Sequence, residues 1–107
     1  MNDENLASAL AAVAAEMERA VDPWWVIGSA AVALHGANTI AADIDLLVSV
    51  CDAMMLIERL RLSAERPDAH PVFRSRIFAR WHRSDRDVEI MAGLAICDDG
   101  RWHPWRP

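Results

Sequence analysis

The sequence predicts an α+β fold of two layers, in which helices pack on one face of a mixed β-sheet. Helical and strand-like segments alternate in the first half of the chain, whereas turns separate several strand-like segments in the second half. The chain has 107 residues, which is the length of one domain. We therefore expect residues 1–107 to form a single domain with its own core.

The first helix and the first strand are predicted from their side-chain patterns. Apolar residues recur at every third or fourth position over residues 5–20, which predicts an amphipathic helix. Aromatic and β-branched side chains over residues 24–27 predict a buried strand. Trp24 and Trp25 are therefore expected in the core, and the alternative is an indole at the rim of a site, where it can stack on a base.

The middle of the chain predicts a second strand between two further helices. A glycine–serine turn at residues 28–29 leads into a helical stretch at 30–35. Residues 43–50 are almost entirely apolar after the first three, which predicts a strand buried on both faces. Asp52 is expected to cap a helix at 54–62.

The last third of the chain predicts strands joined by turns. Residues 72–82 are expected to form one strand or a hairpin, and residues 87–97 a strand that continues past Gly93. The sequence Asp-Asp-Gly at 98–100 is typical of a hairpin turn, and 101–105 would form the edge strand that follows it.

Composition excludes several classes of protein. The net charge of −5 argues against a protein that binds long nucleic acid. The acidic residues at the start of the chain argue against a signal peptide. The lack of a long apolar window argues against a membrane-spanning helix. Two cysteines without metal-ligand spacing favour a cytoplasmic setting. The apolar fraction of 53% predicts a surface for a protein partner or a second copy.

Asp43 and Asp45 are the strongest candidates for chemistry. They stand two residues apart at the start of the predicted strand, so their side chains would point to the same face. Two carboxylates this close repel each other unless a cation or a proton lies between them. A solvated strand start is the alternative, but aspartate is depleted in strands. The pair therefore predicts an oxygen-rich metal site.

Glu89 is the candidate for a third acid. It is a charged residue inside the apolar run of residues 88–91, and it would complete a carboxylate cluster if its strand lies beside that of Asp45. Asp87 shares its face and is the rival candidate. An ion pair with an arginine of residues 74–80 is the alternative for either acid.

Gly28 and Ser29 are candidates for binding phosphate. Glycine lets the backbone approach a ligand closely, and serine adds a hydroxyl at the start of a helix. A plain turn with an N-capping serine is the alternative. The Asp43–Asp45 pair fifteen residues later favours the functional interpretation.

Together these motifs resemble the nucleotidyltransferase superfamily with the polymerase-β-type fold. The resemblance is to its small bacterial aminoglycoside, lincosamide and AbiEii-like branches, and it covers residues 24–105. That family has a glycine–serine turn, an Asp-apolar-Asp pair and a third acid on a later strand, here Glu89 where aspartate is commoner. The resemblance thus implies a nucleotidyltransferase-like fold.

The resemblance also implies an activity and its residues. Asp43, Asp45 and Glu89 would be catalytic and bind two Mg²⁺ ions against a nucleoside triphosphate such as ATP. Gly28 and Ser29 would hold its phosphate oxygens. A nucleoside monophosphate would pass to a hydroxyl of a small molecule or a protein.

Two other functions are open from the sequence. Relatives usually have further helices that shape the acceptor pocket, and this chain ends at residue 107. That part would be absent, supplied by a partner, or lost by truncation. The first alternative is therefore a non-catalytic module of the same fold, antitoxin-like or regulatory, that works in a complex or as a homodimer. The second is a small domain whose acids bind a structural cation.

Overall fold

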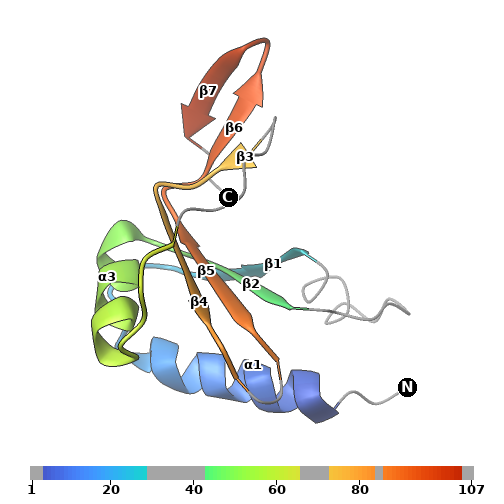
Figure 1. Cartoon of the computed structure of the whole chain (residues 1–107), viewed down its shortest axis with the longest axis vertical. Coiled ribbons are helices and arrows are strands. Elements are labelled where there is room, and N and C mark those ends of the chain that lie inside the picture. Colours follow the sequence, from blue (N-terminus) through green and yellow to red (C-terminus); the bar gives the residue numbers. More distant parts are fainter. Residues whose placement is uncertain (1–3, 29–42, 66–72, 84–85, 105–107) are drawn as a thin grey trace.

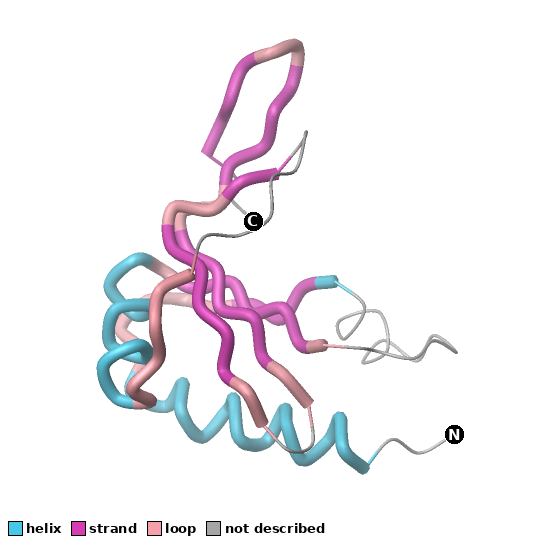
Figure 2. The backbone as a smooth tube through the Cα atoms, viewed as in Figure 1, coloured by secondary structure: helices cyan, strands magenta, loops and turns pink. Residues whose placement is uncertain are grey.

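The protein consists of a four-stranded sheet covered by helices and a smaller sheet that extends from its end. The computed structural model describes residues 4–28, 43–65, 73–83 and 86–104. Figure 1 shows helix α1 (Glu4–Glu16) running below the larger sheet, with helix α3 (Val50–Arg59) beside it. Figure 2 shows the second sheet projecting away from both helices. The predicted α+β fold with a mixed sheet and helices on one face is confirmed.

Two helices form where the apolar periodicity predicts them. Helix α1 spans Glu4–Glu16 and continues as a short 3-10 helix, η1, over Met17–Arg19. Helix α3 spans Val50–Arg59. An ion pair of 2.7 Å between Arg59 Nη2 and Glu16 Oε1 ties the end of α3 to the end of α1. None of the helices in the part of the chain that the structure describes combines the length and hydrophobicity needed to cross a bilayer.

The larger sheet has the strand order β1-β2-β5-β4. Strand β2 pairs in parallel with β5, and the other two pairs are antiparallel. A parallel pair needs a long connection, which here contains α3, the short strand Phe73–Arg74 and β4. The bounds of the four strands are Trp25–Ile27 for β1, Ile44–Val48 for β2, Ile77–Trp81 for β4 and Val88–Ala92 for β5.

The core lies on one face of this sheet, against α1 and α3. Alternate residues of β2 and β5 point to this face, because successive side chains of a strand point to opposite sides. The strand residues of the core are Ile44, Leu46, Val48, Val88, Ile90 and Ala92. The residues between them, which include Asp45 and Glu89, occupy the opposite face of the sheet, called the open face below.

The second sheet arises because two predicted strands each divide. Its strands are β3 (Phe73–Arg74), β6 (Ala95–Asp98) and β7 (Arg101–Pro104), in the order β3-β6-β7. The prediction that residues 87–97 form one strand was wrong. The chain bends at Gly93, where φ is +66° and a side chain would meet Arg76 Cβ at 2.6 Å. The hairpin turn at residues 98–100 is confirmed, with positive φ at both central residues.

The cap of α3 is also different from the prediction. Ser49, not Asp52, is the N-cap, and its Oγ accepts a hydrogen bond from the Asp52 backbone N–H at 3.1 Å. Asp52 is only 1% exposed and accepts the backbone N–H groups of Val21 and Asp22 instead. It thereby fixes the segment that leads into β1. The predicted helix at 30–35 lies outside the described residues.

Candidate functional site

Asp45 and Glu89 form a pair of carboxyl groups on the open face. They are direct neighbours in the parallel pairing of β2 with β5. Burial, followed by a hydrogen bond to Glu89 and repulsion from Glu89 and Asp43, raises the pKa of Asp45 from 3.8 to about 7. Below about pH 7, and in the absence of a cation, Asp45 therefore holds a proton and donates it in a hydrogen bond to Glu89.

Asp43 lies just before β2 and acts on this pair over a longer distance. The start of β2 is fixed beside β5 by a hydrogen bond of 3.0 Å from the Ile44 backbone N–H to the Asp87 carbonyl. Asp43 is half-buried, and its charge contributes to the raised pKa of Asp45. Within the described residues, no three histidine, cysteine or acidic side chains stand close enough together to hold a metal ion as they are placed. The predicted triad is thus a contacting pair with a nearby third acid.

Of the two candidates for the third acid, Glu89 has the position that the prediction needs. Asp87 precedes β5, and its Oδ2 lies 3.2 Å from Nδ1 of the exposed His82. Glu89 instead faces Asp45 across the strand pair. The alternative of an ion pair is realised as well, because Glu89 Oε1 lies 3.2 Å from Nη2 of Arg80, its antiparallel neighbour on β4.

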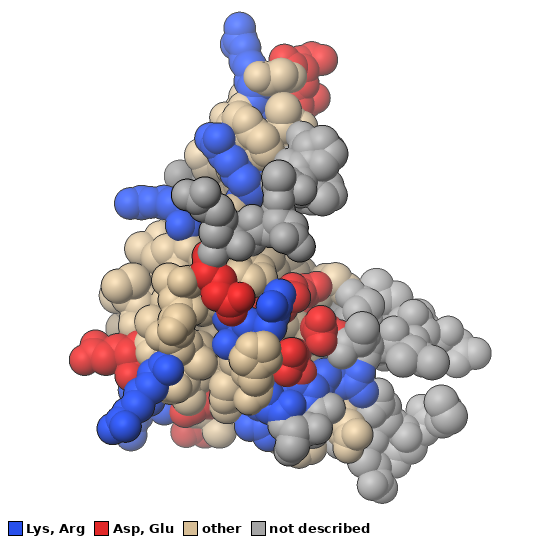
Figure 3. All heavy atoms as spheres, viewed as in Figure 1, with Lys and Arg blue, Asp and Glu red and all other residues tan. Residues whose placement is uncertain are grey.

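Arg80 joins two acids at the edge of the site. Besides Glu89, its Nη1 lies 3.7 Å from Oε1 of Glu65. Figure 3 shows acidic side chains gathered around a basic one in the middle of the view, over β4 and β5, where these ion pairs lie. The sequence offered one signal for this contact, since Arg80 is the polar residue of an otherwise apolar strand. No sequence pattern indicated that Glu65 would pair with Arg80.

Gly28 lies against Asp45 at the end of β1. Its φ is +72°, and a Cβ built there would collide with Asp45 Oδ2. The register explains this approach, because Ile27, the residue before Gly28, is paired with Asp45. The glycine therefore leaves room for the carboxyl group that the site uses. Ser29, the other predicted phosphate-binding residue, lies outside the described residues.

The oxygen donors of this site fit Mg²⁺. Mg²⁺ is bound through one or two carboxylates, with water and substrate phosphates completing its coordination. Asp45 and Glu89 supply two carboxyl groups in contact, Asp43 adds a third negative charge, and Gly28 keeps one side of Asp45 free of a side chain. A cation between Asp45 and Glu89 would replace the proton that now relieves their repulsion.

One solved structure has a similar fold. No protein-family model and no curated protein matches the chain. The chain is similar to a crystal structure described as that of a "putative nucleotidyltransferase (TM1012) from Thermotoga maritima", with a TM-score of 0.79 and 21% sequence identity. The similarity covers 97% of this chain and 66% of that protein, so the chain spans less than two thirds of its length. The chain therefore has a nucleotidyltransferase-like fold, as the resemblance predicted.

Proposed function

We propose that the chain is a Mg²⁺-dependent nucleotidyltransferase that transfers a nucleoside monophosphate from a nucleoside triphosphate to a hydroxyl group. The observation that carries the proposal is the contact between Asp45 and Glu89 beside Gly28, on the open face of a nucleotidyltransferase-like sheet. The two carboxyl groups share a proton that relieves their repulsion. A bound cation would relieve the same repulsion, so the pair can serve as a cation site. The fold similarity supports the same activity.

Each residue of the site has a proposed role. Asp43, Asp45 and Glu89 would hold the two ions that the resemblance implies, and bound Mg²⁺ would neutralise the charge of the phosphates. The backbone at Gly28 and Ser29 would hold phosphate oxygens. Glu89, kept in place by Arg80, would accept the proton of the attacking hydroxyl. The hydroxyl oxygen would form a bond to the α-phosphorus while the bond to pyrophosphate breaks and pyrophosphate leaves with the electron pair.

Calorimetry with Mg²⁺ and each of the four nucleoside triphosphates tests the proposal. We expect heat of binding for at least one triphosphate, which is lost when Mg²⁺ is removed and weakened in Asp45→Asn. Asp98→Asn is the matched control, because Asp98 is an exposed aspartate on β6, in the other sheet. The proposal fails if none of the four triphosphates binds, or if the two variants bind equally well.

A second candidate is a non-catalytic module of the same fold. The ion pair between Arg80 and Glu89 favours it, because a guanidinium already neutralises the acid that would serve the acceptor hydroxyl. Such a module would bind a nucleotide without transferring it and would act with a protein partner or as a homodimer. Pyrophosphate release by the wild-type chain, together with a monomeric mass in light scattering, would exclude it.

A further inference from the structure

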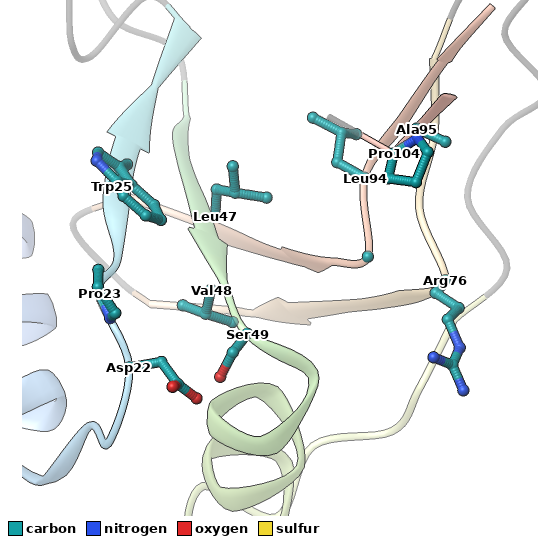
Figure 4. Close-up of a pocket in the computed structure, with 11 residues that line it drawn as sticks. Asp22, Pro23, Trp25, Leu47, Val48, Ser49, Arg76, Leu94, Ala95 and Pro104 are labelled. Carbon is teal, nitrogen blue, oxygen red and sulfur yellow. The ribbon is translucent and has the colours of Figure 1, made fainter. Parts of the chain in front are cut away.

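A pocket of about 540 Å³ lies where the second sheet leaves the end of the larger one. Figure 4 shows Trp25 and Leu47 on the larger sheet facing Leu94 and Pro104, which come from the bend after β5 and the end of β7. None of the roles proposed above uses these residues. The volume lies within the range of roughly 300–1,000 Å³ that is usual for pockets that bind small molecules.

The pocket opens on the same face as the pair of carboxyl groups. Leu47 follows Asp45 by two residues on β2, so both side chains point to the open face. Trp25 is the antiparallel neighbour of Leu47 on β1. Because a strand rises by about 3.3 Å per residue, the pocket begins about 7 Å from Asp45. A small molecule in the pocket can therefore reach the carboxyl groups.

Trp25 gives the pocket a flat aromatic wall. Both tryptophans of residues 24–25 were expected in the core, but only Trp24 packs against it. Trp25 points to the opposite face and is 39% exposed. An indole that is this accessible, next to aliphatic walls, offers a ring a surface on which to stack.

The charges around the pocket argue against a phosphate group. Asp22 lies at one side of it and Arg76 at the other, as Figure 4 shows. A triphosphate would meet one guanidinium and one carboxylate, so the lining gives it little net attraction. The aliphatic and aromatic walls likewise offer a sugar few hydrogen-bonding partners. The lining suits a neutral molecule with an apolar ring.

We infer that this pocket seats the acceptor, and that the acceptor is a neutral alcohol with an apolar ring. The ring stacks on Trp25 between Leu47 and Leu94, and the hydroxyl points along β2 toward Asp45 and Glu89. The inference rests on the proposed transferase activity for the role of the hydroxyl. The ring pocket itself does not depend on Mg²⁺ or on a nucleotide.

Binding of phenylethanol, followed by NMR without metal or nucleotide, tests the pocket. We expect saturable shifts of the Trp25 indole N–H signal and of the Leu47 and Leu94 methyl signals. Loss of the stacking surface in Trp25→Ala should weaken binding about tenfold. Ala95→Leu, which adds side-chain volume to the pocket lining, should weaken it by a similar factor even if removal of Trp25 disturbs β1.

Two controls separate the pocket from the metal site. Met54→Ala shortens an apolar side chain that is 55% exposed on α3, outside the pocket, and should leave phenylethanol binding unchanged. Ala95→Leu should leave Mg²⁺–triphosphate binding unchanged, whereas Asp45→Asn should weaken it. Shifts that do not saturate, or equal affinity in Trp25→Ala, Ala95→Leu and Met54→Ala, overturn the pocket while the proposed transferase activity stands. Phenylethanol binding without any triphosphate binding overturns the acceptor role, because the proposed function has then failed.

Discussion

Replacement of Asp45 by asparagine should stabilise the metal-free protein above neutral pH. In the wild type, burial, a hydrogen bond to Glu89 and the repulsion of neighbouring acids raise the pKa of Asp45 to about 7. The folded state therefore binds more protons than the unfolded state between the ordinary pKa of 3.8 and the raised pKa of about 7. The free energy of unfolding then falls as the pH rises through this window.

The size of the effect follows from the shift and from solvent exposure. A shift of roughly three units corresponds nominally to about 4 kcal/mol. Asp45 is only half-buried, so solvent screens the interaction, and about 1–2 kcal/mol is the realistic loss. Asparagine has no charge to bury, and its side-chain N–H can donate to Glu89 in place of the carboxyl proton. We expect the variant to match the wild type near about pH 4 and to exceed its stability by about 1–2 kcal/mol near pH 8.

Urea unfolding followed by circular dichroism, in EDTA and over a series of pH values, measures this difference. For a domain of about 100 residues, each kcal/mol also raises the melting temperature by about 4–8 °C. Asp98→Asn, which removes an exposed carboxylate, should give no such dependence on pH. Mg²⁺ should stabilise the wild type and reduce the advantage of Asp45→Asn, because a ligand that binds only the folded state stabilises it. An Asp45→Asn variant less stable than the wild type near pH 8 would refute the reasoning.

Three other substitutions test the neighbours of Asp45 and the approach to β1. Gly28→Ala places a Cβ against Asp45 at a φ of +72°, so it should lose about 1–2 kcal/mol of stability and also weaken Mg²⁺ binding in calorimetry. Gly100→Ala, with a φ of +73° and open space around it, should lose stability alone. Arg80→Met removes a positive charge beside Glu89 and should tighten Mg²⁺ binding about threefold to tenfold, whereas Arg101→Met in β7 should not. Asp52→Asn leaves one of two backbone N–H groups without a carboxylate acceptor and should cost about 2–3 kcal/mol in urea unfolding.

The faces of the larger sheet were predictable from the sequence because strand periodicity is a local property. Alternation in residues 87–91 correctly placed Glu89 and Met91 on one face and the apolar core residues on the other. The contact between Asp45 and Glu89 was not predictable to the same degree, since it depends on the register of two strands more than forty residues apart. The sequence supported a carboxylate cluster only on the condition that these strands are neighbours.

The errors in prediction came from interactions between distant segments. Ser49 and Asp52 are both good N-cap residues, and the choice between them depends on the backbone of residues 21–22, which Asp52 binds. The strand at 87–97 looked continuous because apolar residues follow Gly93, yet close packing against Arg76 makes the chain turn there. The same alternation that placed Glu89 correctly also implied that adjacent tryptophans face opposite sides.

The charges around Asp45 and Glu89 indicate from which side a cation would reach the site. Arg80 approaches Glu89 from β4, so the side of the pair toward β4 already has its positive charge. Asp45 has no such partner among the ion pairs of the described residues, and it relieves its repulsion with a proton that it shares with Glu89. Its Oδ2 lies toward Gly28, at the end of β1. A cation should therefore enter from the side of β1, where Gly28 carries no side chain, and the charge of Asp43 just before β2 adds to the attraction. The pocket at Trp25 lies farther along the same two strands, so phosphates and acceptor would approach Asp45 from opposite ends of β2.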